Sequence, residues 1–197
     1  MAPSSEKSHR SFAKGNSASK ARTSPTGKAV RGRNVSRRSP SSGANVMRLE
    51  TLLESRDFKE FIESLNSKGV EYLIVGGYAV SFHGYPRYTG DMDVWVGTSK
   101  DNAMKLVLAL KDFGMDSLGL KAEDFVTPDT FVQLGYAPYR IDIITTLSDA
   151  PFSDCLTRAV VVKREGVTLR FIGLDDLKQV KRLAGRPKDL IDLENLQ

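Results

Sequence analysis

Two acidic residues that stand two positions apart, Asp91 and Asp93, form the pair in this sequence best suited to chemistry. The apolar residues that follow them, residues 94–96, favour a strand. Residues two apart on a strand point to the same face, so both carboxylates would face one side of it. Carboxylates this close repel each other and favour a divalent cation with oxygen ligands, Mg²⁺ or Mn²⁺. The alternative is an acidic pair on a solvated strand edge or turn.

A glycine pair precedes these carboxylates. Gly76 and Gly77 follow the apolar run of residues 72–75, which predicts a buried strand, and residues 78–82 predict one or two turns of helix. Glycines at a strand-to-helix turn let the backbone approach a ligand and direct N–H groups at an anion such as phosphate. The alternative is a tight connection without a ligand.

The string GGYAVSFHGYPRYTGDMDVWV, residues 76–96, combines both features. It resembles the signature of the DNA polymerase β-like nucleotidyltransferase superfamily, and is most similar to its bacterial AbiEii-like branch of toxin–antitoxin and abortive-infection systems. In that branch the pattern is GG-x-A-x-x-x-H-G-x-x-R-x-T-x-D-h-D, where h is apolar. Besides the glycines and aspartates, the matching residues are Ala79, His83, Gly84, Arg87 and Thr89.

The resemblance implies a third carboxylate on a later strand, and Asp142 in the apolar segment 138–144 is the candidate. Asp91, Asp93 and Asp142 would then be the catalytic, metal-binding residues. Three carboxylates at one site would raise one another's pKa without metal, so Asp142→Asn would leave the fold at least as stable. The alternative places Asp142 on an edge strand facing water.

Nucleotide-binding residues are also implied. Gly76 and Gly77 would hold the β- and γ-phosphates of a nucleoside triphosphate (NTP), and Arg87 would neutralise phosphate charge, because a guanidinium suits phosphate oxygens. Thr89, in the same matched string, is grouped with them. The alternative for Arg87 is a surface loop. His83 is expected to form a structural hydrogen bond rather than to act as a base.

The C-terminal segment LDDLKQVKRLAGRPKDLIDLENL, residues 174–196, resembles the same family: a helix, a break and a second helix. Lys181 or Lys188 would reach the triphosphate, with Asp189 or Asp192 orienting it. The alternative is that these lysines occupy the solvent-exposed faces of amphipathic helices.

The elements that must position these residues follow from periodicity. Apolar spacing predicts a helix over residues 47–66, with Asp57 as a cap before a fresh start, and another over about 100–113 capped by Thr98 or Ser99. Strands are predicted at 131–135 and 138–144, and a hairpin at 159–162 and 167–171. The class is α/β (α+β): a small mixed sheet with flanking helices, a C-terminal helical pair and, by resemblance, a nucleotidyltransferase fold.

The first 46 residues differ from the rest of the 197. They contain ten Lys or Arg and one acid, which leaves four net negative charges for the remainder of a chain whose formal charge is +5. Few apolar residues occur there, so the segment is predicted to be a disordered tail, and residues 47–197 the nucleotidyltransferase-like domain. The tail is a solvated extension, sequence upstream of the true start, a nucleic-acid-binding arm or an organelle transit peptide.

Cysteine and histidine usage restricts the remaining chemistry. One cysteine, Cys155, excludes an internal disulfide and a cysteine-based zinc site, and two histidines exclude a histidine-rich metal site. No apolar run approaches the roughly 18 residues that span a bilayer. The sequence predicts a cytoplasmic protein without a membrane partner.

Taken together, the motifs and the resemblance imply a metal-dependent nucleotidyltransferase that moves a nucleoside monophosphate from an NTP to an acceptor hydroxyl and releases pyrophosphate. The acceptor would be tRNA or another RNA, a protein or a small molecule. Two alternatives stand beside this function. One is a non-catalytic nucleotide- or nucleic-acid-binding module, and the other is a toxin–antitoxin component that depends on a cognate partner. The chain is short for an AbiEii toxin.

Overall fold

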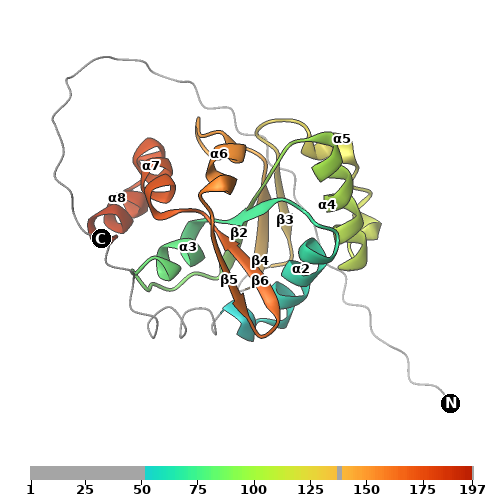
Figure 1. Ribbon diagram of the computed structural model, residues 1–197, viewed down its shortest axis with the longest axis horizontal. Coiled ribbons are helices and arrows are strands. Elements are labelled where there is room, and N and C mark those ends of the chain that lie inside the picture. Colours follow the sequence, from blue (N-terminus) through green and yellow to red (C-terminus); the bar gives the residue numbers. More distant parts are fainter. Residues whose placement is uncertain (1–51, 137–138, 197) are drawn as a thin grey trace.

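A six-stranded mixed sheet with helices on both sides makes up the molecule, in a computed structural model that describes residues 52–136 and 139–196 (Figure 1). The strand order is β3-β4-β2-β1-β6-β5. The described elements are α2 (Arg56–Ser67), β1 (Tyr72–Ile74), α3 (Gly76–Phe82), β2 (Asp91–Val96), α4 (Lys100–Asp112), η1 (Asp116–Leu118), α5 (Ala122–Phe125), β3 (Phe131–Leu134), β4 (Arg140–Ile144), α6 (Phe152–Thr157), β5 (Val160–Arg164), β6 (Val167–Phe171), α7 (Leu174–Ala184) and α8 (Pro187–Asn195).

The predicted class, a small mixed sheet with flanking helices and a C-terminal helical pair, is confirmed. The predicted disordered tail, residues 1–46, lies outside the described residues, as do residues 47–51 and Pro138. No helix within the described ranges is long and apolar enough to cross a membrane.

The sheet separates a hydrophobic face from a polar one. On β2, Met92 and Val94 are fully buried and alternate with Asp91 and Asp93, so the two sets point to opposite faces. The apolar face packs against α2 and α4, which lie together on one side of the sheet, whereas α3, α7 and α8 lie on the other (Figure 1). The aspartates therefore face the side of α3 and the C-terminal helices.

Helix caps explain where the two covering helices begin. Ser55 caps α2, its Oγ accepting a hydrogen bond from the Phe58 amide, so the prediction of Asp57 as the cap is wrong by two residues. Asp57 lies instead in the first turn, where its charge favours the helix dipole. Ser99 caps α4, one of the two residues predicted.

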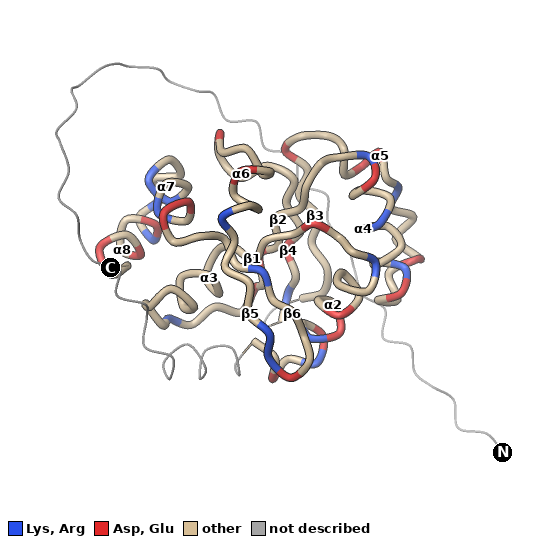
Figure 2. The backbone as a smooth tube through the Cα atoms, viewed as in Figure 1, with Lys and Arg blue, Asp and Glu red and all other residues tan. Residues whose placement is uncertain are grey.

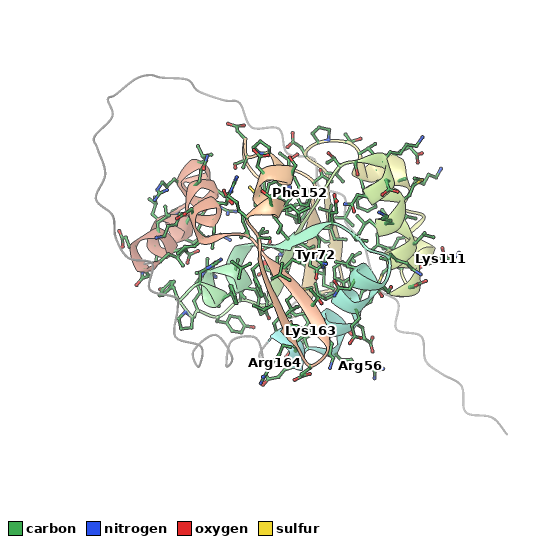
Figure 3. All side chains as sticks on the ribbon, viewed as in Figure 1. Arg56, Tyr72, Lys111, Phe152, Lys163 and Arg164 are labelled. Carbon is green, nitrogen blue, oxygen red and sulfur yellow. The ribbon has the colours of Figure 1, made fainter. Side chains whose placement is uncertain are left out.

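The far end of the polar face is closed by α6. Phe152, labelled in Figure 3, packs edge-on against Trp95 of β2 with ring centroids 5.1 Å apart. Trp95 shares its face with Asp91 and Asp93, since the three alternate along β2. The apolar contact between Trp95 and Phe152 thus limits the polar part of this face to the beginning of β2.

The C-terminal helical pair forms as predicted. α7 ends at Gly185, which has the left-handed φ of 59° that suits a glycine cap, and α8 begins at Pro187. This tight break brings α8 back along α7. The two helices, marked by adjacent acidic and basic segments in Figure 2, lie beside α3.

Candidate metal and nucleotide site

Asp91, Asp93 and Asp142 come together at the centre of the sheet. β2 and β4 pair in parallel with Asp93 opposite Asp142, and one carboxylate oxygen from each of the three residues lies within 4.8 Å of the others. β4 lies between β3 and β2, and Asp142 is only 3% exposed. The alternative of Asp142 on a solvated edge strand is therefore wrong.

Arg140 is the site residue that sequence reasoning missed. It lies two residues before Asp142 on the same face of β4, and its guanidinium grips both Asp142 oxygens at 2.7 and 2.8 Å. Its Nη2 also donates to Asp91 Oδ2 at 3.0 Å. The period-two spacing of Arg140 and Asp142 was the available signal. The cluster thus contains three carboxylates and one fixed cation.

Within residues 52–136 and 139–196, no cation contacts the Asp93 carboxylate, whereas Asp91 and Asp142 both contact Arg140. Burial, followed by the charges of Asp91 and Asp142, raises the pKa of Asp93 to about 6, while Lys188 and Arg186 act in the opposite direction. The expected mutual effect of the carboxylates therefore appears at Asp93. Lys188, Arg186 and Asp93 line the same cavity.

The glycine turn fits closely around these side chains. Gly76 has φ 60°, and a Cβ added there would lie 1.8 Å from Asp93 Oδ2. A Cβ on Gly77 would lie 2.5 Å from Oγ1 of Thr89, the hydroxyl that donates to Asp91 Oδ1 at 2.9 Å. Glycine is therefore required at both positions, because the side chains of Asp93 and Thr89 leave no room for a Cβ atom. They are also the first two residues of α3, although the helix was predicted to begin at Tyr78.

Lys181 and Arg87 belong to a buried ion network rather than to exposed surfaces. Lys181 is 4% exposed, and its Nζ donates to Asp189 at 3.0 Å and to Asp192 at 2.6 Å. Arg87 donates through Nε and Nη2 to both oxygens of Asp192, and Arg186 contacts Asp189. The alternatives of a solvent-exposed helix face for Lys181 and a simple surface loop for Arg87 are therefore wrong.

This network keeps its aspartates ionised. Burial alone would raise the pKa of Asp189 and of Asp192, but the hydrogen bonds and charges of the surrounding cations outweigh it and lower both. Asp192 joins α8 to the loop before β2, while Lys181 joins α8 to α7. The network therefore fixes the C-terminal helices over the glycine turn.

A cavity of about 300 Å³ lies between the glycine turn, β2 and the C-terminal helices. Its lining includes eight of the nine predicted site residues, and the ninth, Asp142, contributes to the carboxylate cluster beside it. The predicted residues in the lining are Gly76, Gly77, Arg87, Thr89, Asp91, Asp93, Lys181 and Lys188. Lys188 is exposed and, within the described ranges, makes no salt bridge, so it can meet a ligand in this cavity.

His83 has the structural role expected of it. Its Nε2 lies 2.7 Å from the carbonyl oxygen of Ile172, which ties the end of α3 to the residue after β6. Burial lowers the pKa of His83, so the ring is neutral near pH 7 and donates this hydrogen bond. It does not line the cavity.

The donor set fits a divalent cation that prefers oxygen ligands. Within the described part of the chain, Asp93 supplies a carboxylate without a cationic partner, and Asp91 retains exposure, at 38% of its side chain. Asp142 is different, because Arg140 occupies both of its oxygens. Asp91 and Asp93 are therefore better placed than Asp142 to ligate an ion.

No protein-family model matches the sequence, and no curated protein does. Among solved structures, a protein from Thermotoga maritima described as a putative nucleotidyltransferase is similar to this chain, with 16% identity and a TM-score of 0.48. The match covers 72% of this chain and 91% of that one.

Proposed function

We propose that this protein is a metal-dependent nucleotidyltransferase, acting in the cavity between the glycine turn and the C-terminal helices. The observation that carries the proposal is the meeting of three carboxylates, within 4.8 Å of one another, next to two close-packed glycines and exposed cations. Transfer of a phosphoryl-type group depends mainly on positioning and on neutralising charge. This cavity provides groups for both.

The NTP phosphates are assigned to the glycine side of the cavity. The amides of Gly76 and Gly77, which line the cavity at the start of α3, would donate to phosphate oxygens. Lys188 and Arg186 line the same cavity, and both affect the pKa of Asp93. Arg87, Thr89 and Lys181 hold the walls of this cavity through their contacts with Asp192, Asp91 and Asp189.

Asp91 and Asp93 would hold Mg²⁺ or Mn²⁺. A divalent ion bound there supplies neutralisation of phosphate charge and lowers the pKa of a hydroxyl. In the reaction the acceptor oxygen forms a bond to the α-phosphorus, the bond from that phosphorus to the bridging oxygen breaks, and pyrophosphate leaves. The proton of the hydroxyl passes to solvent or to a carboxylate of the cluster. Asp142 contributes by fixing Arg140 and adding negative charge beside the ion.

One observation favours a second candidate, a module that binds nucleotide without catalysis. Arg140 holds both oxygens of Asp142, one of the three carboxylates expected to bind metal. A site limited to Asp91 and Asp93 would bind one ion with its nucleotide. Such a site would bind nucleotide but would lack a second ion to activate an acceptor hydroxyl.

A transfer assay separates the two candidates. Purified protein is incubated with each α-³²P-labelled NTP, Mg²⁺ and either total RNA or a lysate fraction, and the products are resolved. Transfer predicts that label appears in one acceptor class while unlabelled pyrophosphate is released, and that Asp91→Asn abolishes both. Nucleotide binding without label in any acceptor, in the presence of Mg²⁺ or Mn²⁺, would support the binding module instead.

A further inference from the structure

A second cavity, of about 440 Å³, adjoins the carboxylate site and is not used by the chemistry above. Arg87 and Thr89 line both cavities, so these two residues form the wall between them. Thr89 also donates to Asp91, which places the second cavity one side chain away from the carboxylate cluster. Its volume lies within the range, roughly 300–1,000 Å³, of small-molecule sites.

Three tyrosines give this cavity aromatic walls. Tyr78 and Tyr139 both pack edge-on against Phe58, with centroid distances of 5.7 and 6.1 Å. Tyr78 is 8% exposed and forms the interior, where burial raises the pKa of its hydroxyl to about 12. Tyr139 and Tyr88 are 58% and 84% exposed, so most of their ring surface remains open to solvent.

We propose that this tyrosine-lined cavity binds a nucleobase. Every base offers a flat aromatic face, and proteins hold unpaired bases by stacking them on exposed aromatic side chains. The cavity offers rings at its mouth, and its cation, Arg87, is already paired with Asp192. Glu54 adds a negative charge to the lining. An anionic ligand is therefore a poor fit, whereas a neutral base is a good one.

The position of the cavity gives the base a place in the reaction, and this part rests on the proposed function. Triphosphate groups are assigned to the other cavity, with its glycines and Lys188. A base beyond the Arg87–Thr89 wall would belong to the NTP itself or to the terminal nucleotide of an RNA acceptor. Both sources present the same chemistry to the tyrosines.

Binding of the four ribonucleosides, measured by saturation-transfer NMR in EDTA, tests the base site without metal, phosphate or catalysis. Tyr88→Ala and Tyr139→Ala should weaken nucleoside binding by roughly 5- to 150-fold, the range for loss of a stacking ring. Tyr88→Phe keeps the ring and should bind as the wild type does. Tyr136→Ala is the matched control, because Tyr136 is 56% exposed and does not line the cavity.

Absence of nucleoside binding to the wild type would overturn the proposal, and so would equal binding by the Tyr88→Ala, Tyr139→Ala and Tyr136→Ala variants. Wild-type protein that binds nucleosides in EDTA but transfers no label would show that the transfer proposal alone has failed. In the transfer assay, a raised KM for NTP in Tyr88→Ala assigns the base to the NTP, and a raised KM for acceptor assigns it to RNA. Unchanged values of both would contradict the proposed subsite.

Discussion

Arg140 is a cation in direct contact with two of the three carboxylates of the acidic site, Asp91 and Asp142. Without it, β2 and β4 would bring three carboxylates together with no fixed cation in contact with Asp142. With it, both oxygens of the buried Asp142 and one of Asp91 accept charge-assisted hydrogen bonds. Asp142 is thus paired with a cation. Its replacement is therefore expected to destabilise the fold, whereas the sequence predicted no loss of stability.

Asp142→Asn is predicted to lower the free energy of unfolding by about 1–3 kcal/mol, because a guanidinium that is one-third exposed loses a charged partner. This reverses the expectation from the sequence that the substitution relieves repulsion without cost. Urea denaturation at pH 7 measures the change. Gln133→Ala on β3 is the control. It removes a neutral side chain whose Nε2 lies 3.5 Å from Asp142 Oδ1 and leaves the ion pair with Arg140 in place. A variant as stable as the wild type would show that the Arg140 contact contributes nothing.

Asp93 is predicted to destabilise the fold at neutral pH. Its pKa is about 6 in the folded protein against 3.8 for an ordinary aspartate, so the unfolded chain loses this proton first as pH rises. Between those values the folded state binds more protons, and stability falls with rising pH. Asp93→Asn should therefore be about 1–3 kcal/mol more stable than the wild type at pH 7, without metal. The difference should shrink as the pH falls towards 4 and vanish only well below 3.8.

Denaturation of both proteins from pH 4 to pH 8 in EDTA tests this prediction. A difference that is constant over the whole range would contradict a titrating Asp93.

The pair Asp91 and Asp93 was predictable from period-two spacing on a strand. Asp142 could be predicted as a site residue only through the family resemblance. The contact of Arg140 with Asp142 depends on a side-chain rotamer that spacing alone does not specify.

At the scale of elements, the turn from β1 into α3 sets the geometry of the site. Val75 donates its amide to the Asp93 carbonyl, so the turn is fixed to β2. Gly76 then takes a left-handed φ directly against the Asp93 carboxylate. The sequence predicted a glycine turn here, but it could not indicate which side chain fills the space beside it.

Gly76→Ala should cost more stability than backbone strain alone, and Gly69→Ala measures that strain. Gly69 has φ 64° with nothing within 4 Å of an added Cβ, whereas at Gly76 the added atom meets Asp93 Oδ2. Gly69→Ala is predicted to cost about 1–2 kcal/mol, and Gly76→Ala at least about 1 kcal/mol more, because Asp93 must move. Equal losses in thermal or urea denaturation would show that Asp93 moves aside freely.

Local patterns account for most other elements. The strands, the C-terminal helices and the 100–113 helix were predictable from apolar period, and Gly185 and Pro187 marked the break. The hairpin turn at Glu165 and Gly166 has φ of 49° and 81°, the two positive angles typical of a type I′ turn. The predicted N-cap of α2 was wrong because serine and aspartate, at Ser55 and Asp57, both suit that position.

At the scale of the whole molecule, contacts across about a hundred residues close the cavity. Arg87 reaches Asp192, and Asp192 shares Lys181 with Asp189. No periodicity predicts such pairs, because each helical residue alone suits a solvated helix face and Arg87 alone suits a surface loop. The disorder of the basic tail, residues 1–46, remains a prediction from composition. We expect this cavity to hold metal and nucleotide through the β2 carboxylates.

Calorimetric titration of Mg²⁺ with ATP, and separately with CTP, into wild type and Asp93→Asn tests that claim most directly. The wild type should bind at least one of the two complexes, with affinity lost in EDTA, and Asp93→Asn should bind it at least about tenfold more weakly. Asp101→Asn is the matched control, since Asp101 is 71% exposed on α4, on the opposite side of the sheet (Figure 1). Equal affinity of wild type and Asp93→Asn, with or without Mg²⁺, would contradict the account.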